Sequence, residues 1–137
     1  MEKDCQYLSW ENAPIGPLLG HAAHLARERM DVRLARYDVT PAQTHVLLYL
    51  GEQSGPTPQR DVVEHLRVKP PTANGILDRL EEKKLICRRA DPEDLRQKRV
   101  CLTEKGRELR VRLQNAFQEG AALTLHGLSE EETAVLR

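Results

Sequence analysis

Apolar residues recur every three or four positions in the first part of the chain, starting at Ile15. This spacing places them on one side of an amphipathic helix of roughly 20 residues, which should end near Tyr37. Charged side chains cover much of the opposite side, so that side should face water. The apolar positions are Ile15, Leu18, Leu19, Ala22, Leu25, Ala26 and Met30.

A second helix has a clear start signal. Thr40 can cap it, Pro41 suits its first position, and Gln43 can complete a capping box. The apolar run at residues 46–50 follows directly. We therefore predict a helix that begins at Pro41 and buries this run.

The next two helices form a closely spaced pair. Thr57 and Pro58 repeat the combination of a capping residue and a proline, so we expect Thr57 to cap a short helix over residues 58–66. A four-residue turn separates it from a helix over residues 71–84, where Pro71 lacks an N–H that the first helical position does not need. Two helices joined by such a turn are typical of a helix-turn-helix.

Two short segments after this pair predict a β-hairpin. Residues 85–89 and 100–102 are the candidate strands, and the polar loop between them contains the turn-forming pair Asp91 and Pro92. A hairpin in this position is a wing beside the helix-turn-helix. Thr103 should then cap a long helix, and residues 129–132 form another capping box. The predicted fold is mainly α-helical with a small β-hairpin wing.

Composition narrows the function classes. The 137 residues fit one domain or two small lobes, and 21 basic against 21 acidic side chains exclude a polybasic protein. No run approaches the roughly 18 apolar residues of a membrane span, so we expect no membrane association. A signal-peptide pattern is absent, and three widely spaced cysteines make no disulfide framework. Both points favour a reducing, cytoplasmic location.

Positive charge is nevertheless concentrated locally. Residues 83–107 contain nine basic and four acidic side chains, a net charge of +5 in a neutral chain. Such a field attracts a polyanion and releases counterions from it. A solvated charged surface is the alternative, but the position directly after a helix-turn-helix favours double-stranded DNA.

The second helix of the pair is the candidate for reading DNA. Thr72 and Asn74 lie near its start and suit base edges or phosphates, and Arg79 lies two turns further along. The alternatives are a local backbone hydrogen bond for Thr72 and an intrahelical ion pair of Arg79 with Glu81 or Glu82. Both readings of each residue stay open at this stage.

Two further positions invite an explanation. Arg96 at the hairpin tip suits a narrow minor groove, and Asp94 could orient its guanidinium; an exposed ion pair is the alternative. Gly75 interrupts a helix, which costs up to about 1 kcal/mol relative to Ala. Either another backbone packs closely there or DNA does.

The same residues resemble a known family. The motifs Asp38-Val-Thr-Pro-Ala-Gln43 and Pro71-Thr72 through Asp78-Arg79-Leu80-Glu81, and above all Asp91-Pro-Glu-Asp-Leu-Arg96-Gln-Lys-Arg-Val-Cys-Leu-Thr-Glu-Lys-Gly106, are similar to those of the MarR family of winged-helix transcription regulators. The likeness runs from about residue 15 to residue 137.

The resemblance implies a homodimer that binds a pseudo-palindromic operator and usually represses transcription. Residues 1–37 would form an arm and a dimerisation helix, residues 38–102 the winged lobe, and residues 103–137 further dimerisation helices. The implied DNA contacts are Thr72, Asn74 and Arg79 in the major groove, the wing pair Asp94 and Arg96 in the minor groove, and the supporting cations Lys98 and Arg99.

Two positions depart from the family pattern. Lys69 stands where a serine cap is common, and Gly75 stands where the family often has arginine. Weaker groove contacts would fit an alternative function, a helical dimer whose winged lobe binds another protein.

The resemblance also implies an effector, often a small phenolic or apolar anion held between the two lobes. Tyr37, His45 and Tyr49 are candidate lining residues, with ordinary core packing as the alternative. Cys5 is similar to the N-terminal cysteines of thiol-sensing members, which makes redox regulation another alternative. Cys87 and Cys101 fall on facing strands, and we expect them to be small apolar fillers.

Catalysis is not predicted. No catalytic triad, phosphate-binding glycine loop or HExxH motif is present, so we expect no enzyme activity and no cofactor. His21 and His24 lie one helical turn apart, but a pair without a third ligand is more often incidental than a metal site.

Overall fold

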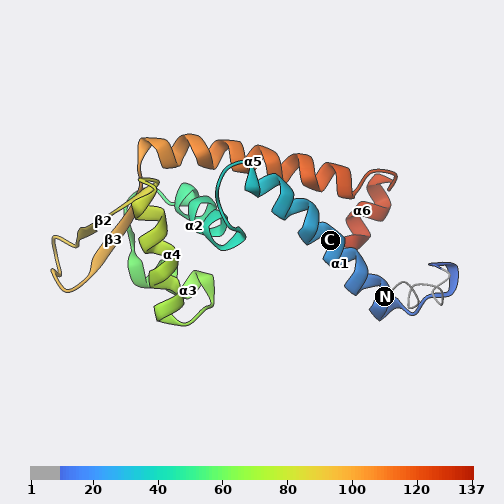
Figure 1. The fold of residues 1–137 in the computed structure, drawn as a ribbon, viewed down its shortest axis with the longest axis horizontal. Helices are drawn as coiled ribbons and strands as arrows, with labels where there is room; N and C mark the ends of the chain where they lie inside the picture. The colour runs from blue at the N-terminus through green and yellow to red at the C-terminus, as the bar shows by residue number, and fades with distance from the viewer. Residues whose placement is uncertain (1–9) are drawn as a thin grey trace.

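The computed structural model describes residues 10–137, in which six α-helices and a three-stranded sheet are arranged as an elongated molecule (Figure 1). Helix α5 extends from the sheet at one end to α1 and α6 at the other. The elements in chain order are the 3₁₀ turn η1 (Trp10–Asn12), α1 (Ile15–Ala35), α2 (Pro41–Glu52), β1 (Thr57–Pro58), α3 (Gln59–Leu66), α4 (Pro70–Glu82), β2 (Ile86–Ala90), β3 (Lys98–Leu102), α5 (Glu104–Thr124) and α6 (Glu130–Leu136).

The predicted helix starts at Thr40, Thr103 and Ser129 are confirmed. The Thr40 hydroxyl accepts the backbone N–H of Gln43 at 3.2 Å, and the Gln43 side chain accepts the N–H of Thr40 at 3.3 Å. The Thr103 hydroxyl accepts the N–H of Gly106 at 3.0 Å, and Ser129 heads a complete capping box. These local signals need only residues within one turn of each other.

The prediction that Thr57 caps a helix is wrong. Thr57 and Pro58 form β1, which pairs with Val100 and Arg99 of β3, while α3 begins after Pro58 without a side-chain cap. The hairpin therefore gains a third strand, and the order in the sheet is β1-β3-β2. A β-branched threonine fits a strand, and the open edge of β3 supplies the pairing that a local pattern cannot reveal.

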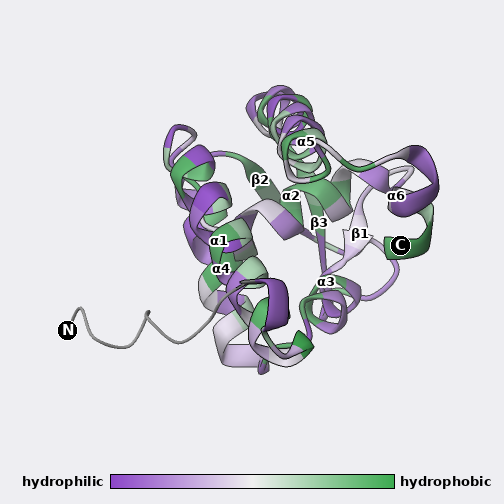
Figure 2. Cartoon of the chain, turned by 90° about the vertical axis from the view of Figure 1, so that its right-hand side faces the viewer, coloured by the Kyte–Doolittle hydropathy of each residue, from purple (hydrophilic) through white to green (hydrophobic). Residues whose placement is uncertain are grey.

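The hydrophobic core is centred on α2. Helix α2 lies in the middle of the molecule, with α5 on one side and α3 on the other (Figure 2). Its buried residues share one apolar cluster with side chains from α1, α3, α4, α5, β2 and β3. The largest fully buried apolar side chains are Leu34, Val46, Leu47, Val62, Leu77, Leu80, Ile86, Val100 and Leu113.

Helix α1 is the predicted amphipathic helix, but most of its apolar face is uncovered. Ile15 and Leu19 are 72% and 61% exposed, and Leu34 is the one residue of α1 that is buried. The Arg33 guanidinium donates to the Ala116 carbonyl at 3.1 Å and so joins α1 to α5. Among residues 10–137, no helix is long and apolar enough to span a bilayer.

Candidate nucleic-acid interface

The start of α4 projects as an exposed polar surface. Ala73, Leu77 and Leu80 bury one side of the helix, and periodicity therefore leaves Thr72 and Arg79 exposed on the other. Within the described chain, Thr72 has no side-chain hydrogen bond and Arg79 has no ion pair. The local alternatives for these two residues are thus not realised.

The turn between α3 and α4 has the geometry of a helix-turn-helix. Arg67 adopts a left-handed conformation with φ of 52°, which reverses the chain within a few residues. Lys69 occupies the N-cap position of α4 and makes no side-chain cap, as its departure from serine implied. Its ammonium is exposed beside the first turn of α4.

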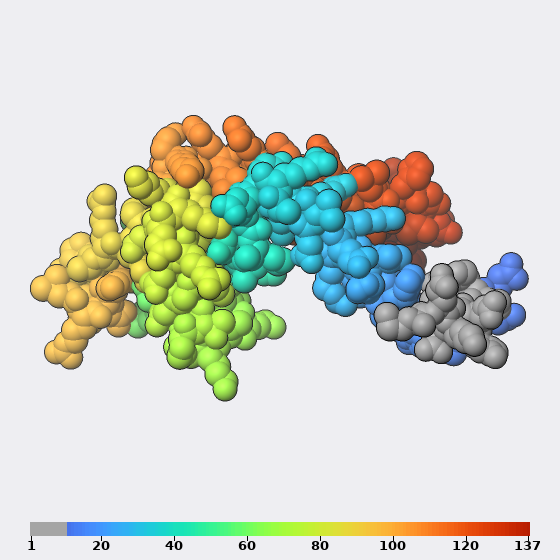
Figure 3. Space-filling view, in the orientation of Figure 1, coloured from blue at the N-terminus to red at the C-terminus, as the bar shows by residue number. Residues whose placement is uncertain are grey.

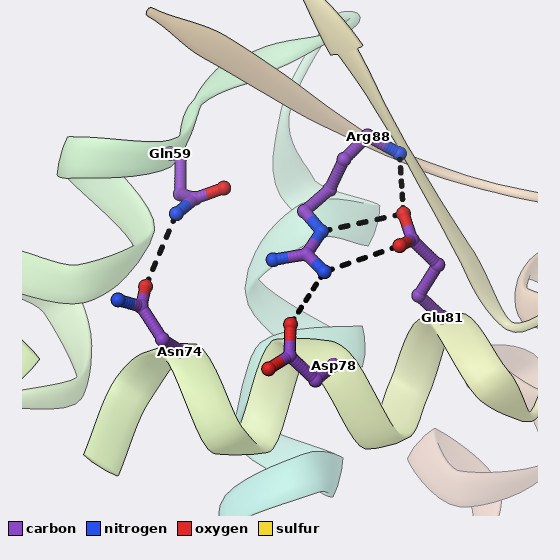
Figure 4. A network of polar contacts seen from close by, with 5 residues as sticks. All are labelled: Gln59, Asn74, Asp78, Glu81 and Arg88. Carbon is purple, nitrogen blue, oxygen red and sulfur yellow. Dashed lines mark hydrogen bonds and ion pairs between the residues drawn. The ribbon is translucent and has the colours of Figure 1, made fainter. Parts of the chain in front are cut away.

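Gln59 is a candidate that the sequence did not indicate. It is the first residue of α3, and its Nε2 donates to Asn74 Oδ1 at 3.2 Å (Figure 4). This hydrogen bond orients the Asn74 amide so that its NH₂ group is turned outward from α3. Only the packing of α3 against α4 brings these two residues together, because they lie 15 positions apart.

Arg88 of β2 binds the wing to α4. Its guanidinium donates to Glu81 at 3.1 and 3.3 Å and to Asp78 at 2.5 Å, and its backbone N–H donates to Glu81 at 3.2 Å (Figure 4). The hydrogen bond from Arg88 lowers the pKa of Glu81, and the same bond raises the pKa of Arg88. Arg88 is therefore engaged inside the protein and is withdrawn from the basic surface.

The wing tip is closed by its own turn. The backbone N–H groups of Asp91 and Gln97 donate to Gln97 O and Asp94 O, both at 2.9 Å. The carboxylate of Asp91 accepts from Glu93 N–H and from Arg99 Nε, each at 3.0 Å, and these contacts lower its pKa in that order.

The predicted contact between Asp94 and the Arg96 guanidinium is not present. Asp94 Oδ1 instead accepts the backbone N–H of Arg96 at 3.1 Å. A carboxylate two residues before an N–H favours this short-range turn over a contact with a long side chain. The Arg96 side chain is exposed, with no acceptor among the described residues.

Exposed positive charge lies on α4 and the wing, next to the exposed carboxylates Glu93 and Asp94 of the wing loop. Arg88 and Arg99 are paired internally, whereas other cations of α4 and the wing are exposed. The wing projects beyond α4 at the left of the view in Figure 3. Within α4, its N-cap residue and the wing, the exposed cations that make no ion pair with another described residue are Lys69, Arg79, Arg89, Arg96 and Lys98.

The three candidate effector residues do not share a cavity. Tyr37 lines a cavity of about 490 Å³ with Lys83, Lys105 and Arg112. Tyr49 stacks on His65 with ring centroids 4.0 Å apart, and His45 is exposed on α2.

The expectation that Cys87 and Cys101 are apolar fillers is wrong. They are direct partners in the β2–β3 ladder, and the structure joins their sulfur atoms in a disulfide. Which residues of two strands lie opposite each other depends on how the strands pair in the folded protein. The spacing of cysteines along the chain does not show this.

Cys5 lies outside the described residues. His24 contacts Glu28 at 3.2 Å, and residues 10–137 hold no cluster of three or more potential metal ligands.

This arrangement of helix-turn-helix, three-stranded sheet and projecting wing defines a winged-helix protein. A model of the MarR family matches residues 37–97. MepR, a transcription regulator of the Staphylococcus aureus multidrug efflux pump MepA, is 32% identical, with 90% of this chain and 91% of that chain covered and a TM-score of 0.78. A structure of the S. aureus MepR–DNA complex has the same identity and coverage and a TM-score of 0.78.

The transcriptional regulator SlyA is 27% identical over 90% of this chain and 87% of that chain, with a TM-score of 0.76. The chain belongs to the MarR family. It is a DNA-binding transcription regulator of that family, and the prediction that it is not an enzyme is confirmed by this assignment.

Proposed function

We propose that the chain binds a pseudo-palindromic operator as a homodimer and represses transcription, with α4 in the major groove and the wing in the adjacent minor groove. The observation that carries the proposal is the rigid link between the two DNA-facing parts. Arg88 holds β2 against Asp78 and Glu81 of α4. This contact fixes the distance between α4 and the wing before DNA binds. Binding therefore loses less conformational entropy.

Helix α4 supplies the base contacts in this proposal. Thr72 and Asn74 reach base edges or phosphates from its first two turns, because an α-helix fits the width of the major groove. Arg79 binds guanine or a phosphate further along. Lys69 contacts a phosphate at the start of the helix, where the helix dipole adds to its charge.

The wing supplies the minor-groove contact. Arg96 extends from the turn that Asp94 closes, and the negative potential of a narrow minor groove holds its guanidinium. Lys98 is exposed at the start of β3 and neutralises a phosphate. Arg99 pairs with Asp91 and so supports the loop that presents Arg96.

A second copy of the chain covers the apolar surface at the other end. The cavity of about 980 Å³ between α1 and α5 is lined by Met30, Phe117 and Leu123, among others. Ile15 and Leu19 add exposed apolar area along α1. Burial of this area stabilises association by about 25 cal/mol per Å² before the cost of association is subtracted.

An effector relieves repression in the same proposal. The Tyr37 cavity, where α5 meets the segment after α1, is lined by the cations Lys83, Lys105 and Arg112. The carboxylates Asp38 and Glu108 also line it, and Asp38 pairs with Lys83. Lys105 and Arg112 make no ion pair among the described residues. A small phenolic anion matches this combination of a ring and positive charge. With salicylate as the probe, operator affinity should fall, and Tyr37→Phe or Arg112→Gln should reduce that fall.

The decisive experiment begins with selection of bound fragments from random duplex DNA, followed by footprinting at several salt concentrations. Two half-sites about 10 bp apart from centre to centre are expected. Arg96→Ala should lower the affinity for the specific site by about tenfold or more. It should also reduce the slope of log affinity against log salt concentration by about one. Arg27→Ala, which removes an exposed charge on α1, is the matched control.

Three results would contradict the proposal. The first is a folded protein that binds no duplex even at low salt, which would favour the protein-interaction alternative. The second is unchanged operator binding by Arg96→Ala. The third is a chain that stays monomeric at the concentrations that occupy the operator.

A further inference from the structure

Cys87 and Cys101 form a bonded pair within the wing. Their Cα atoms lie 5.5 Å apart, inside the range that a disulfide bridges without backbone movement. The pairs on both sides, Ile86 with Leu102 and Arg88 with Val100, hold the register on each side of the bond. The dithiol and disulfide forms therefore fit the same sheet.

A small molecule can reach this pair. Both cysteines are only partly buried, and Cys101 lines an open cavity of about 520 Å³ between the end of α2, β3 and α5. Gly55 and Val111 form other parts of its wall. The Tyr37 cavity described above has other lining residues.

This cavity carries an arginine whose charge is not neutralised. Arg110 lines it, its Nε is buried without an acceptor, and Arg110 makes no ion pair in the described chain. A Cβ on Gly51 would lie 2.2 Å from that Nε, so the absence of a side chain at position 51 lets the arginine occupy this place. Arg107 adds a second cation, although it pairs with Glu104 at 3.2 Å.

We propose that Cys87 and Cys101 are a thiol–disulfide exchange site that takes small anionic disulfides through this cavity. The Cys101 thiolate attacks one sulfur of the incoming disulfide, forms a mixed disulfide and releases the first thiol. The Cys87 thiolate then attacks the Cys101 sulfur, closes the protein disulfide and releases the second thiol. Two electrons and two protons pass from the protein to the small disulfide, and the reverse steps reopen the pair.

The two arginines of the cavity that Cys101 lines favour the exchange reaction in two ways. A cation beside a cysteine favours the thiolate, which is the reacting form. It also raises the local concentration of a negatively charged reagent. Because the pair lies in the wing, its redox state changes the stiffness of the two strands that carry the Arg96 turn.

The test uses the full chain with Cys5→Ser and glutathione disulfide as the probe. Intact mass and alkylation of free thiols should show closure of one intramolecular disulfide, which reduced glutathione reopens. Amides of β2 and β3 should exchange hydrogen several-fold more slowly in the closed form. Adding Cys87→Ser should stop the reaction at a glutathione adduct on Cys101.

The cavity route has its own controls. Arg110→Gln should slow closure by glutathione disulfide by roughly threefold or more and leave closure by the neutral hydroxyethyl disulfide unchanged, whereas Arg110→Lys should restore the rate. If Arg110→Gln does not fold, added salt on the Cys5→Ser protein should slow the anionic reagent and not the neutral one. Equal effects on both reagents would overturn the role of the cavity.

Two results would overturn the exchange site itself. One is that both thiols stay open to alkylation in a folded protein under excess glutathione disulfide. The other is a disulfide that forms between chains instead of within the wing. Neither readout involves DNA, so failure here and failure of the proposed operator binding are distinguishable.

Discussion

Gly106 of α5 lies directly against the backbone carbonyl of Leu85, the residue before β2. A Cβ built on Gly106 would be 2.0 Å from that oxygen. The same oxygen accepts the backbone N–H of Thr103 at 3.1 Å. The absence of a side chain at position 106 therefore lets the first turn of α5 pack onto the base of the wing.

Gly106→Ala should destabilise the protein by about 2 kcal/mol or more, because the added methyl group forces the backbone at Leu85 to move. Urea unfolding followed by circular dichroism measures the change. The comparison is Gly75→Ala, which adds the same methyl group at a position where no described atom outside the helix backbone lies within 4 Å. A loss of stability that is equal in the two variants would show that the contact with Leu85 has no effect.

Gly75→Ala should have opposite effects on stability and on DNA binding. No backbone of another element packs against Gly75 among residues 10–137, so close packing within this part of the chain does not explain the glycine. The substitution should stabilise α4 by up to about 1 kcal/mol. If the operator backbone approaches α4 at this point, the affinity for the operator should fall, as measured by a fluorescence-anisotropy titration. Increased stability with unchanged affinity would show that DNA does not approach α4 at Gly75.

Arg88→Ala and Glu81→Ala should show energetic coupling. Arg88 is 13% exposed and Glu81 is 42% exposed, so the pair is partly screened and the coupling should be about 1 kcal/mol. A double-mutant cycle measured by urea unfolding provides the value. Additive effects of the two substitutions would mean that the contact between Arg88 and Glu81 does not help to hold the wing against α4.

Stability should fall on acidification through the carboxylates of Glu81 and Asp91. Hydrogen bonds from Arg88 lower the pKa of Glu81, and a backbone hydrogen bond followed by Arg99 lowers that of Asp91. A lowered pKa in the folded state means that the unfolded chain binds protons first. The contribution is thus complete above pH about 4.5 and is lost progressively below it.

Unfolding free energies between pH 7 and pH 3 test this dependence. Glu81→Gln keeps the size of the side chain but cannot ionise, so its stability should decline less steeply with acid than that of the unaltered protein. Parallel curves for the two proteins would show that Glu81 does not contribute to the pH dependence.

The sequence by itself determined the features that depend on neighbours within a turn or two. The caps at Thr40 and Ser129, the helix pair and the exposure of Thr72 and Arg79 all follow from local spacing. Side-chain periodicity along a helix is set by the backbone, so one buried face predicts one exposed face.

Only the tertiary structure decided which distant residues meet. Thr57 lies in a strand because β3 offers a free edge, and Cys87 faces Cys101 because the register places them opposite each other. Gln59 contacts Asn74, and Arg88 contacts Glu81, through packing of separate elements. These contacts join positions whose separation in the chain carries no periodic signal, since they arise from the free energy of the assembled core and sheet rather than from any one segment.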